Sequence, residues 1–448
     1  DVLRAAAITA SWFGAQARYR GTRFSLHDNT LPAGHAIVLS TDANPVSGLG
    51  AEKGSHLSVI DNPADPFYKL LVLHGTDGAD LVRAARDLTL RSAELSGRRQ
   101  PVEDVASPPR AANDSPRWVS TEMPVELGSL VPGDQLRTRG LYPGVIDVGF
   151  RASPDLFLWP GETVPLRVRY QFAEGPWLDN EKSRLDVALN GRFLKSLPPP
   201  RRDWWGTIKR ELGAGDSGQQ EAVIPVPPDL IHGENRLTFY FNMRYTLEDE
   251  CDPVLPGDVV NQVFPGSTLD LTHTRHLAVM PSLSAFVAAG YPFSARADLG
   301  HTGLVLPASP DMATLATALD LMARIGAASG YPALGVEVAL GVGGLHRLRD
   351  RDLLAVLPLE DPALLRLLRG SAFQRDDQAL RIRPPSLADR LRHAALGDWF
   401  LEHEEAAIAL AGQREPRALM AMPSSLNSDH WQVLVTAEDS AQLPAMAE

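Results

Sequence analysis

The spacing of the apolar residues changes twice along this chain of 448 residues. Over residues 1–90, and again over residues 272–448, helical spacing alternates with short apolar runs, which indicates helices packed on buried strands. Between them, residues 118–271 place apolar residues at every second position, the pattern of strands with one polar face. The sequence therefore predicts an α/β domain, an antiparallel β-sandwich and a second α/β domain, in that order.

The first domain begins with a helix whose apolar stripe is formed by Ile8, Trp12, Ala15 and Tyr19. Three apolar runs follow, and continuous runs of this kind are typical of strands covered by helices on both faces. These runs are residues 35–39, 57–60 and 69–73. Serines, glycines, prolines and arginines then dominate residues 91–117, which we interpret as a linker.

In the middle domain, apolar and polar residues alternate strictly along the predicted strands. Leu166, Val168, Tyr170 and Phe172 alternate with polar residues that include Arg167, so these four side chains are predicted to face inward. A register shifted by one residue would bury arginines instead. The dipeptide at residues 190–191 is Asn-Gly, a strong signal for a tight hairpin turn.

The last domain contains a long helix predicted to start at Ser309 as N-cap, with Pro310 in the first turn and Gly330 just past its end. Apolar runs that suit buried strands lie on both sides of this helix, at residues 304–306, 336–338, 353–357 and 432–435. Residues 71–81 and 433–443 both read as a strand, a turn and the start of a helix. This similarity indicates either an internal duplication or a pattern shared by any strand–turn–helix unit.

Charge and cysteine content exclude several classes of protein. The formal net charge of −12 argues against a nucleic-acid-binding protein, which needs a basic surface to neutralise phosphates. Because Cys251 is the single cysteine, an internal disulfide framework and a cysteine-based zinc site are both excluded. The uncharged stretch 277–295 contains two prolines and a glycine, so we expect a loop and a short helix rather than a membrane span.

No coherent set of catalytic or cofactor-binding residues is found. The sequence has no phosphate-binding glycine loop and no nucleophile elbow, and the glycines of 341–344 indicate a surface turn. The acidic run 248–252 is interpreted as a solvated loop, with calcium binding as the alternative. Residues 402–405, which include His403, are interpreted as a solvated helix face. We therefore expect no catalytic residue, no cofactor and no bound metal.

Three tryptophans of the middle domain are candidates for saccharide contact, because the C–H faces of sugar rings stack on exposed indoles. They are Trp177, which follows a Gly-Pro pair, and Trp204 and Trp205, which follow three consecutive prolines. The alternative is that these rings cap the end of the sandwich core. The segment 230–239 also resembles the closing strands of carbohydrate-binding jelly rolls that are appended to glycosidases.

The region following the sandwich carries a more specific resemblance. The residues that carry it lie in the stretches 266–271, 277–281, 286–294, 297–299 and 304–307. These stretches are similar to the periplasmic subunit of bacterial cellulose synthase, a family long labelled cyclic di-GMP-binding protein. In that family, two carbohydrate-binding jelly rolls alternate with two flavodoxin-like domains, and a membrane anchor follows.

The resemblance implies flavodoxin-like domains at 1–90 and 272–448 that flank a jelly roll at 118–271, with a linker at 91–117. It also implies that the chain is a fragment from which the first jelly roll and the anchor are missing. The implied role is non-catalytic, at the periplasmic face of the bacterial inner membrane. The partners would be the membrane-embedded catalytic subunit of cellulose synthase and the nascent glucan chain.

Two other functions stay open from the residues alone: a glycoside hydrolase with an accessory jelly roll, and a periplasmic saccharide-binding module. The family label also raises the question of cyclic di-GMP. Arg347 and Arg351 have the R-x-x-x-R spacing of the usual cyclic di-GMP motif, but its second half is absent after them. We therefore expect the nucleotide to bind the catalytic subunit instead.

Overall fold

A computed structural model describes the chain as two compact units, residues 1–116 with 279–448 and residues 117–278. The described residues are all except 51–52, 141, 160, 176, 201–218, 232, 246–258, 370, 372, 377–378, 383–416 and 448. The mixture of α/β and β architecture expected from the sequence is confirmed. In the described part of the chain, no helix has both the length and the apolar character needed to cross a bilayer.

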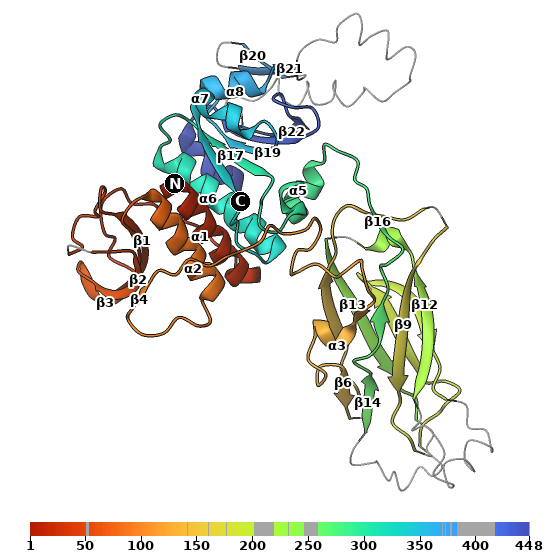
Figure 1. The fold of residues 1–448 in the computed structure, drawn as a ribbon. Helices are drawn as coiled ribbons and strands as arrows, with labels where there is room; N and C mark the ends of the chain where they lie inside the picture. Colours follow the sequence, from red (N-terminus) through yellow and green to blue (C-terminus); the bar gives the residue numbers. More distant parts are fainter. Residues whose placement is uncertain are drawn as a thin grey trace, which may run out of the picture. The chain divides into compact units, whose positions relative to one another are not determined.

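The first unit begins with a four-stranded sheet in the order β1-β3-β2-β4 (Figure 1). β1 and β3 are parallel, whereas β2 is antiparallel to both β3 and β4. The elements of this region are α1 (Val2–Ala17), β1 (Ala36–Thr41), β2 (His56–Asn62), β3 (Asp65–Gly75), α2 (Gly78–Arg91) and β4 (Arg99–Pro101). The strand β4 thus lies within the stretch 91–117 that the sequence indicated as a linker.

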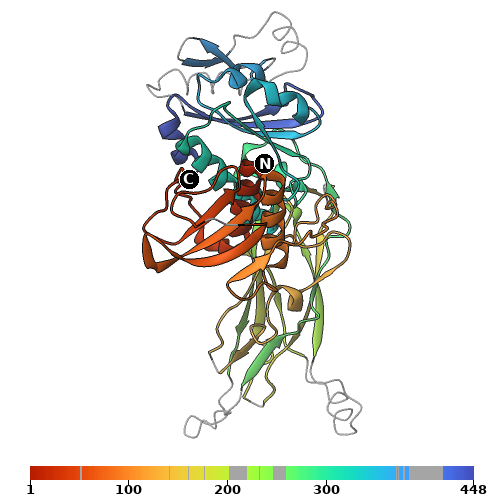
Figure 2. The same ribbon diagram turned by 60° about the vertical axis from the view of Figure 1, so that its left-hand side comes forward.

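The expectation that helices cover both faces of this sheet is wrong. The helices α1 and α2 lie on one face of this sheet (Figure 2). On that face, Leu57 and Leu73 pack with side chains of the two helices. On the other face, Val38, Leu70 and Val72 are covered by apolar side chains of the connecting segments, such as Leu31, Val46 and Leu49. Periodicity reports that a strand is buried on both faces but not which kind of element covers it.

The second sheet of the same unit has five strands in the order β18-β17-β19-β23-β22, of which only β22 is antiparallel to its neighbour. The helices α6 and η5 cover one face, and α7, η4 and α8 cover the other. The strands are β17 (Thr302–Leu306), β18 (Glu337–Leu340), β19 (Asp352–Val356), β22 (Arg417–Pro423) and β23 (Trp431–Ala437). The helices are α5 (Leu283–Ala289), α6 (Met312–Ser329), α7 (Gly341–Gly344), η4 (Leu345–Leu348), α8 (Pro362–Leu367) and η5 (Ser440–Ala447), and a hairpin is formed by β20 (Phe373–Asp376) and β21 (Ala379–Ile382).

The predicted long helix is present as α6, but its N-cap is Asp311 and not Ser309. The Asp311 carboxylate accepts a hydrogen bond from the Thr314 amide at 2.8 Å. The C-cap is Gly330, which has φ 77° as the sequence predicted for a helix-ending glycine. Asp and Ser are comparable N-caps, because either side chain can accept a hydrogen bond from an unpaired amide of the first turn. The sequence alone therefore does not decide between Ser309 and Asp311.

The helices α1 and α6 lie side by side and join the two sheets of the first unit (Figure 1). Their backbones are so close that a Cβ added at Gly14 would overlap the Ala323 carbonyl, and one added at Gly326 would overlap the Ser11 carbonyl. The Ser11 hydroxyl also accepts a hydrogen bond from the Ala333 amide at 2.8 Å. The N-terminal helix therefore packs against both α/β regions.

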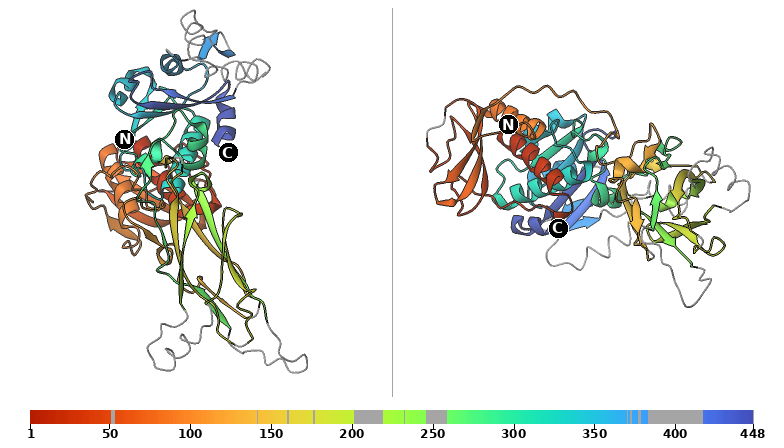
Figure 3. Two further views of the ribbon diagram at one scale, coloured as in Figure 1. Left: turned by 90° about the vertical axis from the view of Figure 1, so that its right-hand side faces the viewer. Right: turned by 90° about the horizontal axis from the view of Figure 1, so that it is seen from below.

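The second unit contains two antiparallel sheets whose inner faces share one hydrophobic core (Figure 3). One sheet has the order β11-β10-β13-β7. The other has the order β5-β15-β9-β14-β6, with β12 also paired to β9. The strands are β5 (Val125–Glu126), β6 (Arg137–Arg139), β7 (Ile146–Arg151), β9 (Val164–Gln171), β10 (Arg184–Leu189), β11 (Arg192–Leu197), β12 (Gln220–Val226), β13 (Glu234–Asn242), β14 (Val260–Val263) and β15 (Thr268–Leu269), with the helix α3 (Leu127–Leu130) and a small ladder of β8 (Leu156–Phe157) and β16 (Arg275–His276).

The register predicted for the sandwich is confirmed along β9. Leu166, Val168, Tyr170 and Phe172 are buried in the shared core, whereas Arg167 faces outward and pairs with Glu221 on β12 at 2.6 Å. The predicted hairpin is confirmed as well, since Asn190 and Gly191 join β10 to β11 with φ values of 52° and 79°.

The close contact between α1 and α6 predicts that one added methyl group will destabilise the first unit. We expect Gly326→Ala to lower the stability of the first unit by about 1–3 kcal/mol or more, because the added carbon has no space beside Ser11. Urea unfolding of the chain measures this change. Gly343→Ala is the matched control, since its Cβ would meet no atom within 4 Å. Equal stability of the two variants would contradict the close contact.

Candidate functional site

The structure describes one of the three predicted saccharide-contact residues. Trp177 is half-buried against the sandwich core, and its ring lies over Gly175, where any side chain would collide with the indole. Its ring centroid is 5.7 Å from that of Tyr245, with an angle of 34° between the rings. Trp204 and Trp205 lie outside the described residues, so their role stays a prediction.

Sequence reasoning missed several exposed aromatic residues of the sandwich. Tyr142 is 92% exposed and Tyr240 is 42% exposed, and Trp159 and Phe193 also lie at the surface. A signal existed for Tyr240, because it alternates with the buried Phe239 and Phe241 and so must point outward. No such signal existed for Tyr142, which lies in a loop.

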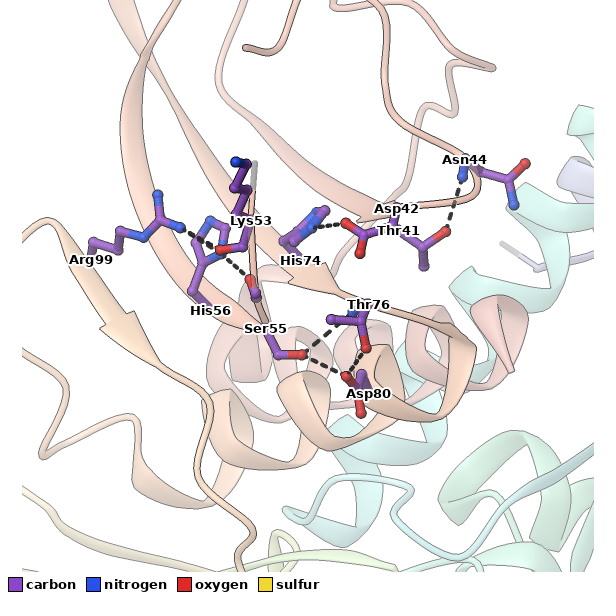
Figure 4. A network of polar contacts seen from close by, with 11 residues as sticks. Thr41, Asp42, Asn44, Lys53, Ser55, His56, His74, Thr76, Asp80 and Arg99 are labelled. Atoms are coloured by element: carbon purple, nitrogen blue, oxygen red, sulfur yellow. Dashed lines mark hydrogen bonds and ion pairs between the residues drawn. The ribbon is translucent and has the colours of Figure 1, made fainter. Parts of the chain in front are cut away.

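A network of polar side chains lies at the edge of the first sheet where β1 and β3 end (Figure 4). The contacting side chains come from the ends of the four strands in the order in which the strands lie in the sheet, β1, β3, β2 and β4. The Asp42 carboxylate lies 3.1 Å from Nε2 of the buried His74, the rings of His74 and His56 are 5.2 Å apart, and Arg99 lies 3.1 Å from His56 Nδ1. In open α/β sheets this edge is where ligands usually bind.

The Asp80 carboxylate occupies the centre of the same edge, at the start of α2. It accepts hydrogen bonds from Ser55 Oγ at 2.7 Å and from Thr76 Oγ1, and it pairs with Arg83. These hydrogen bonds, first that from Thr76, hold the pKa of Asp80 well below its ordinary value. The carboxylate is therefore ionised and paired within the protein, which is a structural arrangement and not that of a general acid.

Four described helices that begin at the carboxyl end of a strand, α2, α6, α8 and η5, already have a carboxylate at their N-terminus, whereas α7, whose N-cap is Leu340, has no side-chain cap. Asp77, Asp311, Asp361 and Asp439 each accept a hydrogen bond from a backbone amide one turn or less further along. These amides are the groups that would bind a phosphate at a helix N-terminus. A phosphate placed there would lose those donors and meet a like charge.

The described residues also offer no arrangement for metal chemistry. No group of three or more histidine, cysteine, aspartate or glutamate side chains in the described part of the chain could hold a metal ion. The acidic run 248–252, with Cys251, and the run 402–405 lie outside the described residues, so the interpretations given for them stay predictions. The glycines of 341–344 form the single turn of α7.

Three sequence models of one protein family match the chain in succession. They are described as the first FD domain of cellulose synthase BcsB at residues 1–102, its second CBM domain at 124–268 and its second FD domain at 276–435. Together they cover most of the sequence. The chain belongs to the cellulose synthase BcsB family.

Curated relatives agree with this assignment to the BcsB family. A protein named cyclic di-GMP-binding protein from Komagataeibacter xylinus is 34% identical over 85% of this chain and 48% of its own length. Another of the same name from Xanthomonas axonopodis pv. citri is 34% identical over 98% of the chain and 58% of its own length. Cellulose synthase 1 of Komagataeibacter xylinus is 33% identical over 85% of the chain and 25% of its own length. The chain thus spans about half the length of the cyclic di-GMP-binding proteins it matches.

The Asp80 network predicts a pH-dependent contribution to stability. Because the folded state lowers the pKa of Asp80, its carboxylate stabilises the fold above the unfolded pKa of about 3.9, and this stabilisation is lost as the pH falls through the lower folded value. We expect Asp80→Asn to lower the free energy of unfolding by about 1–3 kcal/mol at pH 7.

Urea unfolding at pH 7 and at successively lower pH values measures the difference between wild type and Asp80→Asn. That difference should shrink below pH 4. Asp28→Asn, which alters an exposed aspartate, serves as the control and should have no effect at either pH. A constant difference between wild type and Asp80→Asn down to pH 2 would contradict the lowered pKa.

Proposed function

We propose that this chain is part of the non-catalytic periplasmic subunit of a cellulose synthase complex. In this role it supports the membrane-embedded catalytic subunit and guides the nascent β-1,4-glucan across the periplasm. The observation that carries the proposal is the succession of three BcsB domain matches along the chain. The names of the relatives, which include cellulose synthase 1, favour membership in the same kind of complex.

We further propose a flavodoxin-like fold for the second α/β region, 272–448, and a jelly roll for the sandwich, 118–271. In the second α/β region, the strand order β18-β17-β19-β23 has the first strand of the sheet between the second and third, which supports a doubly wound arrangement. The flavodoxin-like fold predicted for 1–90 is less well supported, because that sheet is mixed, has helices on one face and includes β4 at Arg99–Pro101. Two antiparallel sheets around one core support the jelly roll.

The chemistry of the described residues supports a binding role rather than catalysis. The Asp80 carboxylate is paired within the fold, and the N-termini of α2, α6, α8 and η5 carry aspartates that accept bonds from their first amides. The same caps favour the view that cyclic di-GMP binds elsewhere in the complex, since its phosphates would meet carboxylates at these positions.

The alternative of a two-lobed saccharide-binding module is less well supported. Such a module needs two lobes that can move apart, but α1 and α6 approach too closely for even a methyl group between them. The glycoside hydrolase alternative needs a pair of carboxylates at a cleft, and no feature of the described residues favours it over the subunit role.

The proposed subunit role is tested by purification of the full-length protein from membranes. We expect a membrane glycosyltransferase to co-purify with it and glucan synthesis to require it. Gly326→Ala is a useful companion variant, because a disturbed first unit should reduce recovery of the complex. A full-length protein that purifies alone, from cells whose glucan output does not depend on it, would contradict the role.

A separate prediction concerns activity of the chain alone. Incubated with cello-oligosaccharides, it should release no reducing sugar, and in equilibrium dialysis it should retain no cyclic di-GMP. The physical reasons are that the Asp80 carboxylate is engaged in hydrogen bonds within the fold and that Asp311 occupies the amides a phosphate would need at the start of α6. Steady sugar release that a single Asp or Glu substitution abolishes would show that the chain is a hydrolase.

A further inference from the structure

The carboxyl end of β13 gathers aromatic side chains from three separate segments of the sandwich. Tyr240 lies on β13 itself and points outward from the sheet β11-β10-β13-β7, between the buried Phe239 and Phe241. Five residues later, Tyr245 forms an isolated bridge with Leu178. This bridge brings the neighbouring Trp177 beside the end of β13.

The segment that carries Trp177 is held in place by several hydrogen bonds to the residues after β13. The Asp179 amide donates to the Arg244 carbonyl at 2.9 Å, and the Arg244 amide donates to Ser183 Oγ at 2.9 Å. The rings of Trp177 and Tyr245 then stack at 5.7 Å. Since both backbones are fixed, these two rings are pre-organised.

The third contribution comes from the loop that precedes β7. Ile146, the first residue of β7, pairs with Phe239, so the residues before it run beside the end of β13. In this loop Tyr142 is 92% exposed and Val145 is 55% exposed. Burial raises the pKa of the Tyr245 hydroxyl, and the nearby phenol groups of Tyr142 and Tyr240 raise it further.

Polar groups surround these rings on the same face of the sheet. Asp186 on β10 lies directly opposite Tyr240, and Arg184 lies opposite Asn242. Ser196 on β11 is opposite Asp186 and donates a hydrogen bond to it. The surface therefore combines apolar ring faces with hydrogen-bonding side chains, and it includes charges of both signs.

We propose that Tyr142, Trp177, Tyr240 and Tyr245, here called the aromatic patch, form a binding site for a single chain of neutral β-linked glucan. This inference rests on the proposed function and gives its glucan contact a location. Sugar rings have apolar C–H faces that stack on aromatic rings, and hydroxyl groups at their rims that can bond to tyrosine, Asp186 and Asn242. Tyr142 and Tyr240 are the exposed members of the patch, whereas Trp177 and Tyr245 are partly buried against the core and hold their ring positions.

The occupant is a glucan and not an apolar protein segment because the four large side chains of the patch are aromatic and the exposed ones, Tyr142 and Tyr240, carry hydroxyl groups. An aliphatic helix or strand that buried these two hydroxyl groups would offer them no hydrogen-bonding partner. A sugar polymer satisfies them with its own hydroxyl groups.

The test is calorimetric titration of this chain with cellohexaose. Tyr142→Ala and Tyr240→Ala should each weaken binding by about 2- to 13-fold, the change that corresponds to 0.5–1.5 kcal/mol per aromatic contact. Both residues are exposed, so the variants should melt at the temperature of the wild type. Trp177→Phe, which keeps an aromatic ring, should weaken binding less than either alanine variant.

Phe193→Ala is the matched control, because Phe193 is 60% exposed on the same sheet but lies opposite Ala188, at the hairpin end of β10 and β11. It should bind cellohexaose as the wild type does, and α-linked maltohexaose should bind all variants weakly.

Unchanged affinity in both tyrosine variants, an equal loss in Phe193→Ala, or no binding of cellohexaose at all would overturn the inference. The proposed function would survive any of these results if the full-length protein still co-purified with an active glycosyltransferase. It would fail if that co-purification failed, whatever the titration showed.

Discussion

The close contact between α1 and α6 is the interaction on which the first unit depends. At Gly14 and Gly326 the two helix backbones leave no space for a Cβ, and Ser11 adds a hydrogen bond to the Ala333 amide. As a result, two sheets that are far apart in the sequence share one helical layer. The sandwich, which has its own core, is inserted into the chain between them without interrupting that layer.

The sequence predicted those features that depend on local periodicity. The inward face of β9, the Asn190–Gly191 turn and the helix α6 all follow from side-chain spacing or backbone preference. The predicted N-cap of α6 was wrong by two residues, because Ser309 and Asp311 are both good N-caps and the spacing of apolar residues does not distinguish between them. The α1–α6 contact could not be predicted, since small residues such as Gly14 give no periodic signal of a second buried face.

The same limit applies to the candidate sites. Trp177 could be singled out as an aromatic residue next to a Gly-Pro pair, but its partner Tyr245 is 68 residues away and only tertiary structure joins them. Tyr240 was marked as outward-facing by its strand, whereas loop residue Tyr142 carried no signal. The network around Asp80 likewise combines residues from four segments, and its hydrogen bonds identify it as a structural element that occupies the position where a phosphate would bind.

Aspartates thus occupy four helix N-termini at the usual ligand edges of this scaffold, and we propose that its glucan contact lies on the sandwich. Hydrogen exchange measured with and without cellohexaose tests this claim most directly. The account predicts added protection confined to the amides around Tyr142, Trp177 and the 240–245 segment, with none at residues 76–81 or 311–315. Protection at those helix N-termini, and none beside Tyr240, would contradict it.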